Sequence, residues 1–192
     1  MYLSTFECKN KRLLSNADLI HRAIMMKFNE CRHDENVLFM VMNNNLIVQS
    51  NKMPSAAASD SFKLMHSKNC DDVLSSINNG DILHLYGVFE PTVRRLGHDY
   101  VLSSMIERMN WIDRKFSNVA NVLAKNERNV EKKYIENMRE KNRTTRFYGY
   151  DLLIQVTNKE DLIHMLKCGI GRSKSYGAGM CLILNIERGY DS

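Results

Sequence analysis

Residues 37–50 read Val-Leu-Phe-Met-Val-Met-Asn-Asn-Asn-Leu-Ile-Val-Gln-Ser, and this stretch predicts a β-hairpin. Two apolar runs, 37–42 and 46–50, are separated by Asn43-Asn44-Asn45. Asparagine tolerates the positive φ that a tight hairpin turn requires, and apolar runs of this length are typical of strands. The sequence therefore predicts two antiparallel strands at the centre of its first half.

The segments on either side of this hairpin predict the remaining elements of one unit. They are a strand over 1–6, a helix over 18–29, a short helix over 71–78 and a strand over 82–89. Asn16 or Asp18 could cap the first helix, because either side chain can accept hydrogen bonds from N–H groups of the first turn. The order β-α-β-β-α-β is that of a ferredoxin-like unit, so the predicted fold class is α+β with an antiparallel sheet.

The second half of the chain begins after a break near Glu90-Pro91 and has a similar but less regular outline. Its predicted elements are a helix over 102–116, a strand over 147–156, a helix over 158–167 and a last strand over 179–186. The sequence therefore predicts two domains, residues 1–90 and residues 91–192, with a duplication of fold and no visible repeat of sequence.

A glycine-rich segment, residues 169–179, reads Gly-Ile-Gly-Arg-Ser-Lys-Ser-Tyr-Gly-Ala-Gly. Its glycines form two pairs, Gly169 with Gly171 and Gly177 with Gly179. Glycine permits positive φ, and successive exposed N–H groups in such a loop can form a concave anion site. Arg172 and Lys174 add positive charge, so the segment suggests a phosphate backbone as its ligand.

The segment has two other interpretations. The first is a tight helix-to-strand turn that carries basic residues by chance. The second is a nucleotide-binding P-loop, whose pattern places glycine directly before a Lys-Ser pair at the start of a helix. Here Ser173 precedes Lys174 and a predicted strand follows Gly179, so nucleotide triphosphate binding is not expected.

The composition is that of an ordinary globular protein of 192 residues, with 44% hydrophobic and 26% charged residues. The longest apolar run, 37–42, is too short to span a bilayer, and the N-terminal segment lacks the pattern of a secretory signal. Five cysteines without a CxxC pair fit reduced thiols better than a disulfide framework or a zinc site. We therefore expect a cytoplasmic protein with no membrane contact.

The formal net charge of +5 is concentrated in residues 125–146, which hold eight basic and four acidic residues. Such a run can be a solvated helical face. At its end, however, basic residues stand close to Tyr148 and Tyr150, and this mixture suits a surface for RNA or single strands. The basic residues at this end are Arg139, Lys141, Arg143 and Arg146.

The six histidines show no spacing typical of a metal site, and no nucleophile elbow is visible, so neither a metal nor another cofactor is predicted. His21 stands apart because it falls on the first turn of the first predicted helix, at the edge of its buried face. The simpler interpretation is a half-buried structural histidine. The functional interpretation is a proton carrier, since histidine titrates near neutral pH.

The pattern G-h-G-x5-G-h-G (h, apolar) with a lysine inside resembles the glycine-rich loop of the CRISPR repeat-processing ribonucleases. The match narrows to the CasE family, also called Cse3, of type I-E systems. Further similar segments follow the family's order along almost the whole chain. They are Met1-Tyr2-Leu3-Ser4, Leu19-Ile20-His21-Arg22 with Phe28, Val48-Gln49-Ser50 with Met53-Pro54, and Trp111-Ile112-Asp113-Arg114-Lys115. Each match is short, but together and in order they are specific.

The resemblance implies two tandem ferredoxin-like domains, also described as RRM-like or RAMP domains. It implies a metal-independent endoribonuclease that binds the stem-loop of a CRISPR repeat and cuts the precursor RNA at the 3′ base of the stem. The adjacent 2′-hydroxyl would be the nucleophile, which leaves a 2′,3′-cyclic phosphate and a 5′-hydroxyl. It also implies a protein that is monomeric when alone, keeps the mature crRNA and joins the other subunits of the Cascade complex.

Carried onto this sequence, the resemblance makes His21 and Lys174 the catalytic residues. His21 would take one of the two proton-transfer roles, as acid or as base, and Lys174 would stabilise charge on the phosphate. Other residues would bind the RNA backbone, and this binding should weaken steeply with salt. They are Arg139, Lys141, Arg143, Arg146, Arg172, Gly169, Gly171, Gly177 and Gly179.

One position departs from the family. Related proteins often carry an active-site tyrosine three residues before the histidine, where this chain has Asp18. Asp18 could serve only as a helix cap, the second proton carrier could be Tyr176 or Ser175, or cleavage could be slow. A catalytically weak or inactive RNA-binding subunit is therefore the main alternative, and a plain scaffold with a solvated basic stretch is the third.

Overall fold

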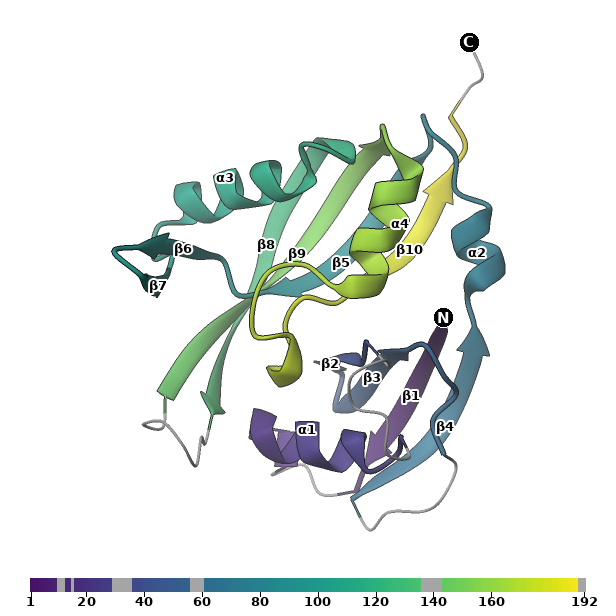
Figure 1. The fold of residues 1–192 in the computed structure, drawn as a ribbon, viewed down its shortest axis with the longest axis vertical. Coiled ribbons are helices and arrows are strands. Elements are labelled where there is room, and N and C mark those ends of the chain that lie inside the picture. The colour runs from purple at the N-terminus through teal and green to yellow at the C-terminus, as the bar shows by residue number, and fades with distance from the viewer. Residues whose placement is uncertain (10–12, 15, 29–35, 56–60, 136–142, 190–192) are drawn as a thin grey trace.

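The computed structural model describes residues 1–9, 13–14, 16–28, 36–55, 61–135 and 143–189. These residues form two four-stranded antiparallel sheets, a small two-stranded sheet and several helices. The fold is α+β and consists of two ferredoxin-like domains in tandem, as predicted (Figure 1).

The first sheet has the ferredoxin-like strand order β2-β3-β1-β4. Its elements are β1 (Tyr2–Cys8), α1 (Ala17–Met25), β2 (Leu38–Met42), β3 (Asn45–Ser50) and β4 (Phe62–Asn69). The predicted hairpin is confirmed, because β2 pairs with β3 and both Asn43 and Asn44 have positive φ, 50° and 63°. Helix α1 is capped by Asn16, whose side chain accepts hydrogen bonds from the N–H groups of Asp18 and Leu19 at 3.1 Å.

The second sheet repeats this order as β10-β5-β9-β8. Its elements are β5 (Ile82–Phe89), α3 (Met105–Phe116), β8 (Ala120–Ile135), β9 (Arg143–Val156), α4 (Lys159–Cys168), the 3-10 turn η2 (Lys174–Tyr176) and β10 (Cys181–Glu187). Helices α3 and α4 lie on one face of the sheet and bury Trp111, Ile112 and Leu162 there (Figure 1). The same strand order therefore occurs twice along the chain, although among the described residues only the second unit has a helix, α4, between its third and fourth strands.

The assignment of strands to the two units differs from the prediction in one place. The strand over 82–89 was expected to complete the first unit, but β5 lies in the second sheet between β10 and β9. The fourth strand of the first sheet is β4, which the sequence analysis missed because the segment is polar and largely exposed. Helix α2 (Asp71–Ser75) connects the units. The domain boundary remains a prediction, and the pairing of β5 favours a position before Ile82 over residue 90.

Strands β8 and β9 form a long hairpin that extends beyond the second sheet. β5 pairs with β9 only as far as Phe89, opposite Tyr148, whereas β8 and β9 remain paired beyond this point. We call residues 130–135 and 143–147 the arm, which leaves the sheet as two green strands in Figure 1. Residues 125–135 of the basic segment therefore lie on a strand, and the alternative of a helical face is wrong for them.

A second hairpin, which the sequence analysis missed, consists of β6 (Thr92–Arg95) and β7 (His98–Val101). Its turn has Leu96 at φ 49° and Gly97 at φ 80°. Positive φ is uncommon for a residue such as leucine, so only the glycine signalled this turn in the sequence. The hairpin lies between β5 and α3 and projects from the end of the second domain (Figure 1).

A hydrophobic cluster joins the two domains. It contains Leu38 and Met40 of β2, Val88 of β5, Phe147 of β9, and Ala178 and Met180 from the end of the glycine-rich segment. The glycine-rich segment therefore contributes to the contact between the domains. In the part of the chain that the structure describes, no helix is long and apolar enough to cross a membrane.

Candidate functional site

The glycine-rich loop, residues 169–179, connects α4 to β10 and includes η2. All four of its glycines have positive φ, as predicted. At Gly171, a Cβ would lie 3.0 Å from the ring of Trp111. At Gly177, a Cβ would lie 2.9 Å from the ring of Phe39. The loop is therefore wedged between α3 of the second domain and β2 of the first, and these glycines are required by packing inside the protein.

Many N–H groups of the loop already have partners within the protein. The N–H groups of Tyr176 and Ala178 donate to Ser173 O, and that of Gly179 donates to Val88 O. The N–H group of Ile170 donates to Gly179 O at 2.8 Å. These amides are therefore already used within the protein and do not form an anion site.

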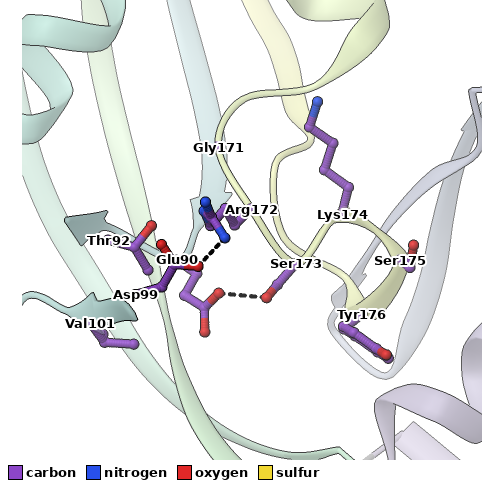
Figure 2. Close-up of a pocket in the computed structure, with 10 residues that line it drawn as sticks. All are labelled: Glu90, Thr92, Asp99, Val101, Gly171, Arg172, Ser173, Lys174, Ser175 and Tyr176. Atoms are coloured by element: carbon purple, nitrogen blue, oxygen red, sulfur yellow. Dashed lines mark hydrogen bonds and ion pairs between the residues drawn. The ribbon is translucent and has the colours of Figure 1, made fainter. Parts of the chain in front are cut away.

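The two basic side chains of the loop extend in different directions, and both have protein partners (Figure 2). Lys174 Nζ donates a hydrogen bond of 2.8 Å to Cys168 O at the C-terminus of α4. Arg172 forms an ion pair with Asp99 of β7, which ties the loop to the β6–β7 hairpin. A phosphate at the loop would therefore compete with a carbonyl for Lys174 and with a carboxylate for Arg172.

A pocket of about 370 Å³ opens between the loop and the β6–β7 hairpin (Figure 2). Its lining includes Glu90, which directly follows β5 and is only 2% exposed. The carboxylate of Glu90 accepts hydrogen bonds from the hydroxyl groups of Thr145 and Ser173. The sequence analysis missed this residue and used Glu90-Pro91 only as a break between elements.

His21 lies in α1 and is half-buried beside the buried positions Ala17, Ile20 and Ile24, as predicted. Helix α1 contacts η2 of the glycine loop and also contacts β8. The helix that carries His21 and the turn that begins with Lys174 are therefore neighbours, although they come from opposite ends of the chain (Figure 1).

Asp18 does not cap α1, so that alternative is wrong. Its carboxylate forms an ion pair of 2.6 Å with Arg22 one turn later, while Asn16 is the cap. Of the two alternative proton carriers, Tyr176 is half-buried, packs against the cluster between the domains and lines the pocket. Ser175 is exposed.

Two of the basic residues predicted to bind RNA, Arg143 and Arg146, lie on the β9 strand of the arm. Arg139 and Lys141 lie outside the described residues. Arg143 is the first residue of β9, and Arg146 is exposed on the same strand. The register places Lys132 of β8 opposite Arg146. Strand pairing therefore gathers basic residues from both strands on the arm.

A buried ionic cluster, which the sequence analysis missed, lies at the base of the arm. Arg108 of α3 donates to both carboxylate oxygens of Glu127 at 2.8 Å and lies 4.1 Å from the ring centre of Tyr148. The Tyr150 hydroxyl donates to Glu127 at 3.0 Å. The hydrogen bonds from Arg108 hold the pKa of Glu127 below its usual range in spite of burial, and burial raises the pKa of Tyr150. The sequence did contain a signal for the burial of Arg108, because this residue lies one helical turn before Ile112 and therefore on the same face of the helix.

Comparison with solved structures defines the class of the fold. The CRISPR endoribonuclease Cse3 bound to a 19-nucleotide RNA matches with a TM-score of 0.84 at 15% identity, over 98% of this chain and 100% of that chain. Cas6e from Escherichia coli K-12 matches with a TM-score of 0.77 at 19% identity, over 95% and 98%. A chain of a CRISPR RNA-guided surveillance complex matches with a TM-score of 0.71 at 16% identity, over 95% and 99%. At these identities the likeness establishes the fold, which is that of Cse3 and Cas6e.

The sequence establishes the family. A model of the family described as CRISPR associated protein matches residues 1–184, so the chain belongs to this family. The resemblance to CasE (Cse3) found in the sequence is thereby confirmed in family and in fold. No curated protein matches the sequence.

Proposed function

We propose that this protein is a metal-independent endoribonuclease that binds the stem-loop of a CRISPR repeat and cuts the precursor RNA at the 3′ base of the stem. The observation that carries the proposal is the packing of α1, which holds His21, against η2, which begins with Lys174. Strand β8, which leads into the basic arm, contacts the same helix. The RNA bound to Cse3, a protein of the same fold, supports RNA as the substrate.

The cleavage step requires two proton transfers and a positive charge. As the 2′-hydroxyl oxygen bonds to phosphorus, a base takes its proton, and an acid protonates the 5′-oxygen whose bond to phosphorus breaks. His21 performs one of these transfers. Lys174 stabilises the negative charge on the phosphorane. Its ammonium group first exchanges Cys168 O for a phosphate oxygen, because a hydrogen bond to a charged oxygen is stronger than one to a neutral carbonyl.

The second proton carrier is assigned to Tyr176. Its side chain is half-buried beside the contact between the domains, on the loop that α1 contacts, whereas Ser175 is exposed. Asp18 is engaged by Arg22 and would repel a phosphate, so it does not replace the family's tyrosine.

The arm holds the stem, because it carries basic residues and extends beyond the sheet on strands of which β8 contacts α1. Cleavage gives an upstream product that ends in a 2′,3′-cyclic phosphate. The stem of this product stays bound to the arm after the cut. The protein then keeps the mature crRNA and joins the other Cascade subunits. The chain of the same fold in a surveillance complex supports this partnership.

The test is incubation of purified protein, at near-stoichiometric concentration and in excess EDTA, with the repeat RNA of its own host. We expect a single cut with a cyclic phosphate on the upstream fragment and a 5′-hydroxyl on the downstream fragment. His21→Ala should lower the single-turnover rate by about 10²–10⁴-fold and leave the Kd for RNA nearly unchanged. His66→Ala is the matched control, because His66 is exposed on β4 at the opposite edge of the first sheet from β2. Equal rates in the wild type and in His21→Ala would refute the assignment.

A second candidate function is a non-catalytic RNA-binding subunit. The observation in its favour is that Lys174 and Arg172 both have protein partners and that Asp18 replaces the tyrosine. Tight binding of the stem-loop by the wild type without any cut in EDTA or in Mg²⁺ would establish this alternative.

A further inference from the structure

Glu90 occupies a particular point in the fold. β5 ends at Phe89, opposite Tyr148, and beyond this point the described residues pair only β8 with β9 in the arm. Glu90 follows directly and turns its carboxylate inward, where it is almost fully buried. A buried carboxylate is costly unless it is hydrogen-bonded, so the groups that satisfy it indicate its role.

The two hydroxyl groups that donate to Glu90 come from the arm and from the glycine loop. Thr145 is on the β9 strand of the arm and is itself 5% exposed. Ser173 is in the loop, and Figure 2 shows its hydroxyl directed at the Glu90 carboxylate. The Glu90 carboxylate therefore joins the arm to the glycine loop.

Ser173 needs such a partner because its backbone is left-handed, with φ of 55° and ψ of 30°. A residue with a Cβ is strained in this conformation. Ser173 also separates Arg172, which extends toward Asp99, from Lys174, which extends toward Cys168 (Figure 2). The conformation of Ser173 thus determines where the two loop cations lie.

We propose that Glu90 is a positioning residue that fixes the left-handed conformation of Ser173 and ties the glycine loop to the base of the arm. The proposal rests on the proposed function for its effect on cleavage. Binding of an RNA stem by the arm then also stabilises the loop that carries Lys174, through the hydrogen bonds from Thr145 and Ser173 to one carboxylate.

The first experiment needs no RNA and uses the single tryptophan of the chain, Trp111, whose ring touches the loop at Gly171. Glu90→Gln keeps the shape of the side chain and removes one of its two acceptor oxygens. We expect Trp111 emission to shift to longer wavelength and its quenching by acrylamide to increase in this variant. Asp81→Asn is the matched control, since Asp81 is equally buried and accepts from Arg188 and the Gly189 N–H group. It should leave Trp111 unchanged.

The second experiment measures cleavage and binding separately. Glu90→Gln should lower the single-turnover rate by about tenfold while the Kd for the stem-loop changes by less than about twofold, since misplaced catalytic groups act on the rate. Ser173→Gly relieves the backbone strain and removes the hydroxyl. In that background Glu90→Gln should have little further effect on the rate, because the two residues act through one hydrogen bond.

The outcomes separate the two proposals. A wild type that binds without cutting, combined with the expected Trp111 changes, refutes the proposed cleavage and supports the role of Glu90 in holding the loop. Unchanged Trp111 emission and quenching in Glu90→Gln overturn that role. An equal loss of rate in the wild-type and Ser173→Gly backgrounds overturns it as well, because Glu90 would then act without Ser173.

Discussion

The glycine loop and the arm are both basic, but their charges are held in different ways. In the loop, Lys174 and Arg172 are bound by groups of the protein, and two of the glycines, Gly171 and Gly177, are packed against aromatic rings. On the arm, Arg146 is exposed on a hairpin that has left the sheet. A loop that is packed against the rest of the protein has a fixed conformation, which catalysis requires. An arm built outward suits the binding of a long ligand.

The largest expected effect concerns the base of the arm, where the buried ion pair of Arg108 and Glu127 attaches the outward-directed arm to α3. Arg108→Ala should lower the free energy of unfolding by about 3–5 kcal/mol, because it leaves the Glu127 carboxylate buried without its cation. Arg128→Ala is the control, since Arg128 pairs with Asp151 at the surface and should change the free energy by less than about 1 kcal/mol. Denaturant unfolding of both variants checks this, and similar losses would contradict a buried anchor.

The next effect concerns the loop cation. Lys174→Ala should slow single-turnover cleavage by about 10²-fold, as the removal of one preorganised electrostatic contact does, while the Kd for RNA changes much less. Lys174→Arg keeps a cation at the same place and should recover part of the rate. If Lys174→Ala changes the Kd and not the rate, the loop serves binding, and its distinction from the arm is lost.

The packing of the loop gives a third effect. Gly171→Ala introduces a strained φ and also a contact with Trp111, whereas Gly97→Ala introduces the strain where nothing lies within 4 Å. Gly171→Ala should therefore cost about 1–3 kcal/mol more than Gly97→Ala. Thermal unfolding of the two variants measures this difference. Equal losses of stability would mean that the ring of Trp111 moves aside to accommodate the new methyl group.

The smallest effect concerns a single charge on the arm. Arg146→Ala should weaken stem-loop binding by a few fold and lower the slope of log Kd against log salt by about 1, with the cleavage rate of bound RNA unchanged. Lys63→Ala, on the exposed edge strand β4, should alter neither quantity. A loss of rate in bound Arg146→Ala would show that the arm also takes part in the chemistry.

The sequence predicted what depends on local conformation and missed what depends on distant partners. It correctly placed the Asn43-Asn44 turn and the positive φ of the loop glycines, and it named Asn16 as one of two candidates for the cap of α1, because these features follow from the residues themselves. It assigned β5 to the wrong unit, since an apolar strand does not reveal which sheet it joins.

The buried charges show the same limit. Glu90 and Arg108 look like surface residues in the sequence, and their partners Thr145 and Glu127 lie 55 and 19 positions away. The residues of the candidate site remain a prediction, which was made because His21 and the loop fitted a family pattern. Its internal ties were not predicted, because Lys174 and Arg172 bind groups that only the folded chain brings near.

The strand pairing also determines when the site can exist during synthesis. All four strands of the first sheet lie within residues 1–69, before β5 begins the second sheet. Domains generally fold in the order in which they leave the ribosome. The loop at residues 169–179 emerges only after β1 to β9 and α4 have been synthesised. A nascent chain that already displays His21 therefore lacks the loop, and the proposed cleavage of RNA would begin only after the loop has packed between the two domains.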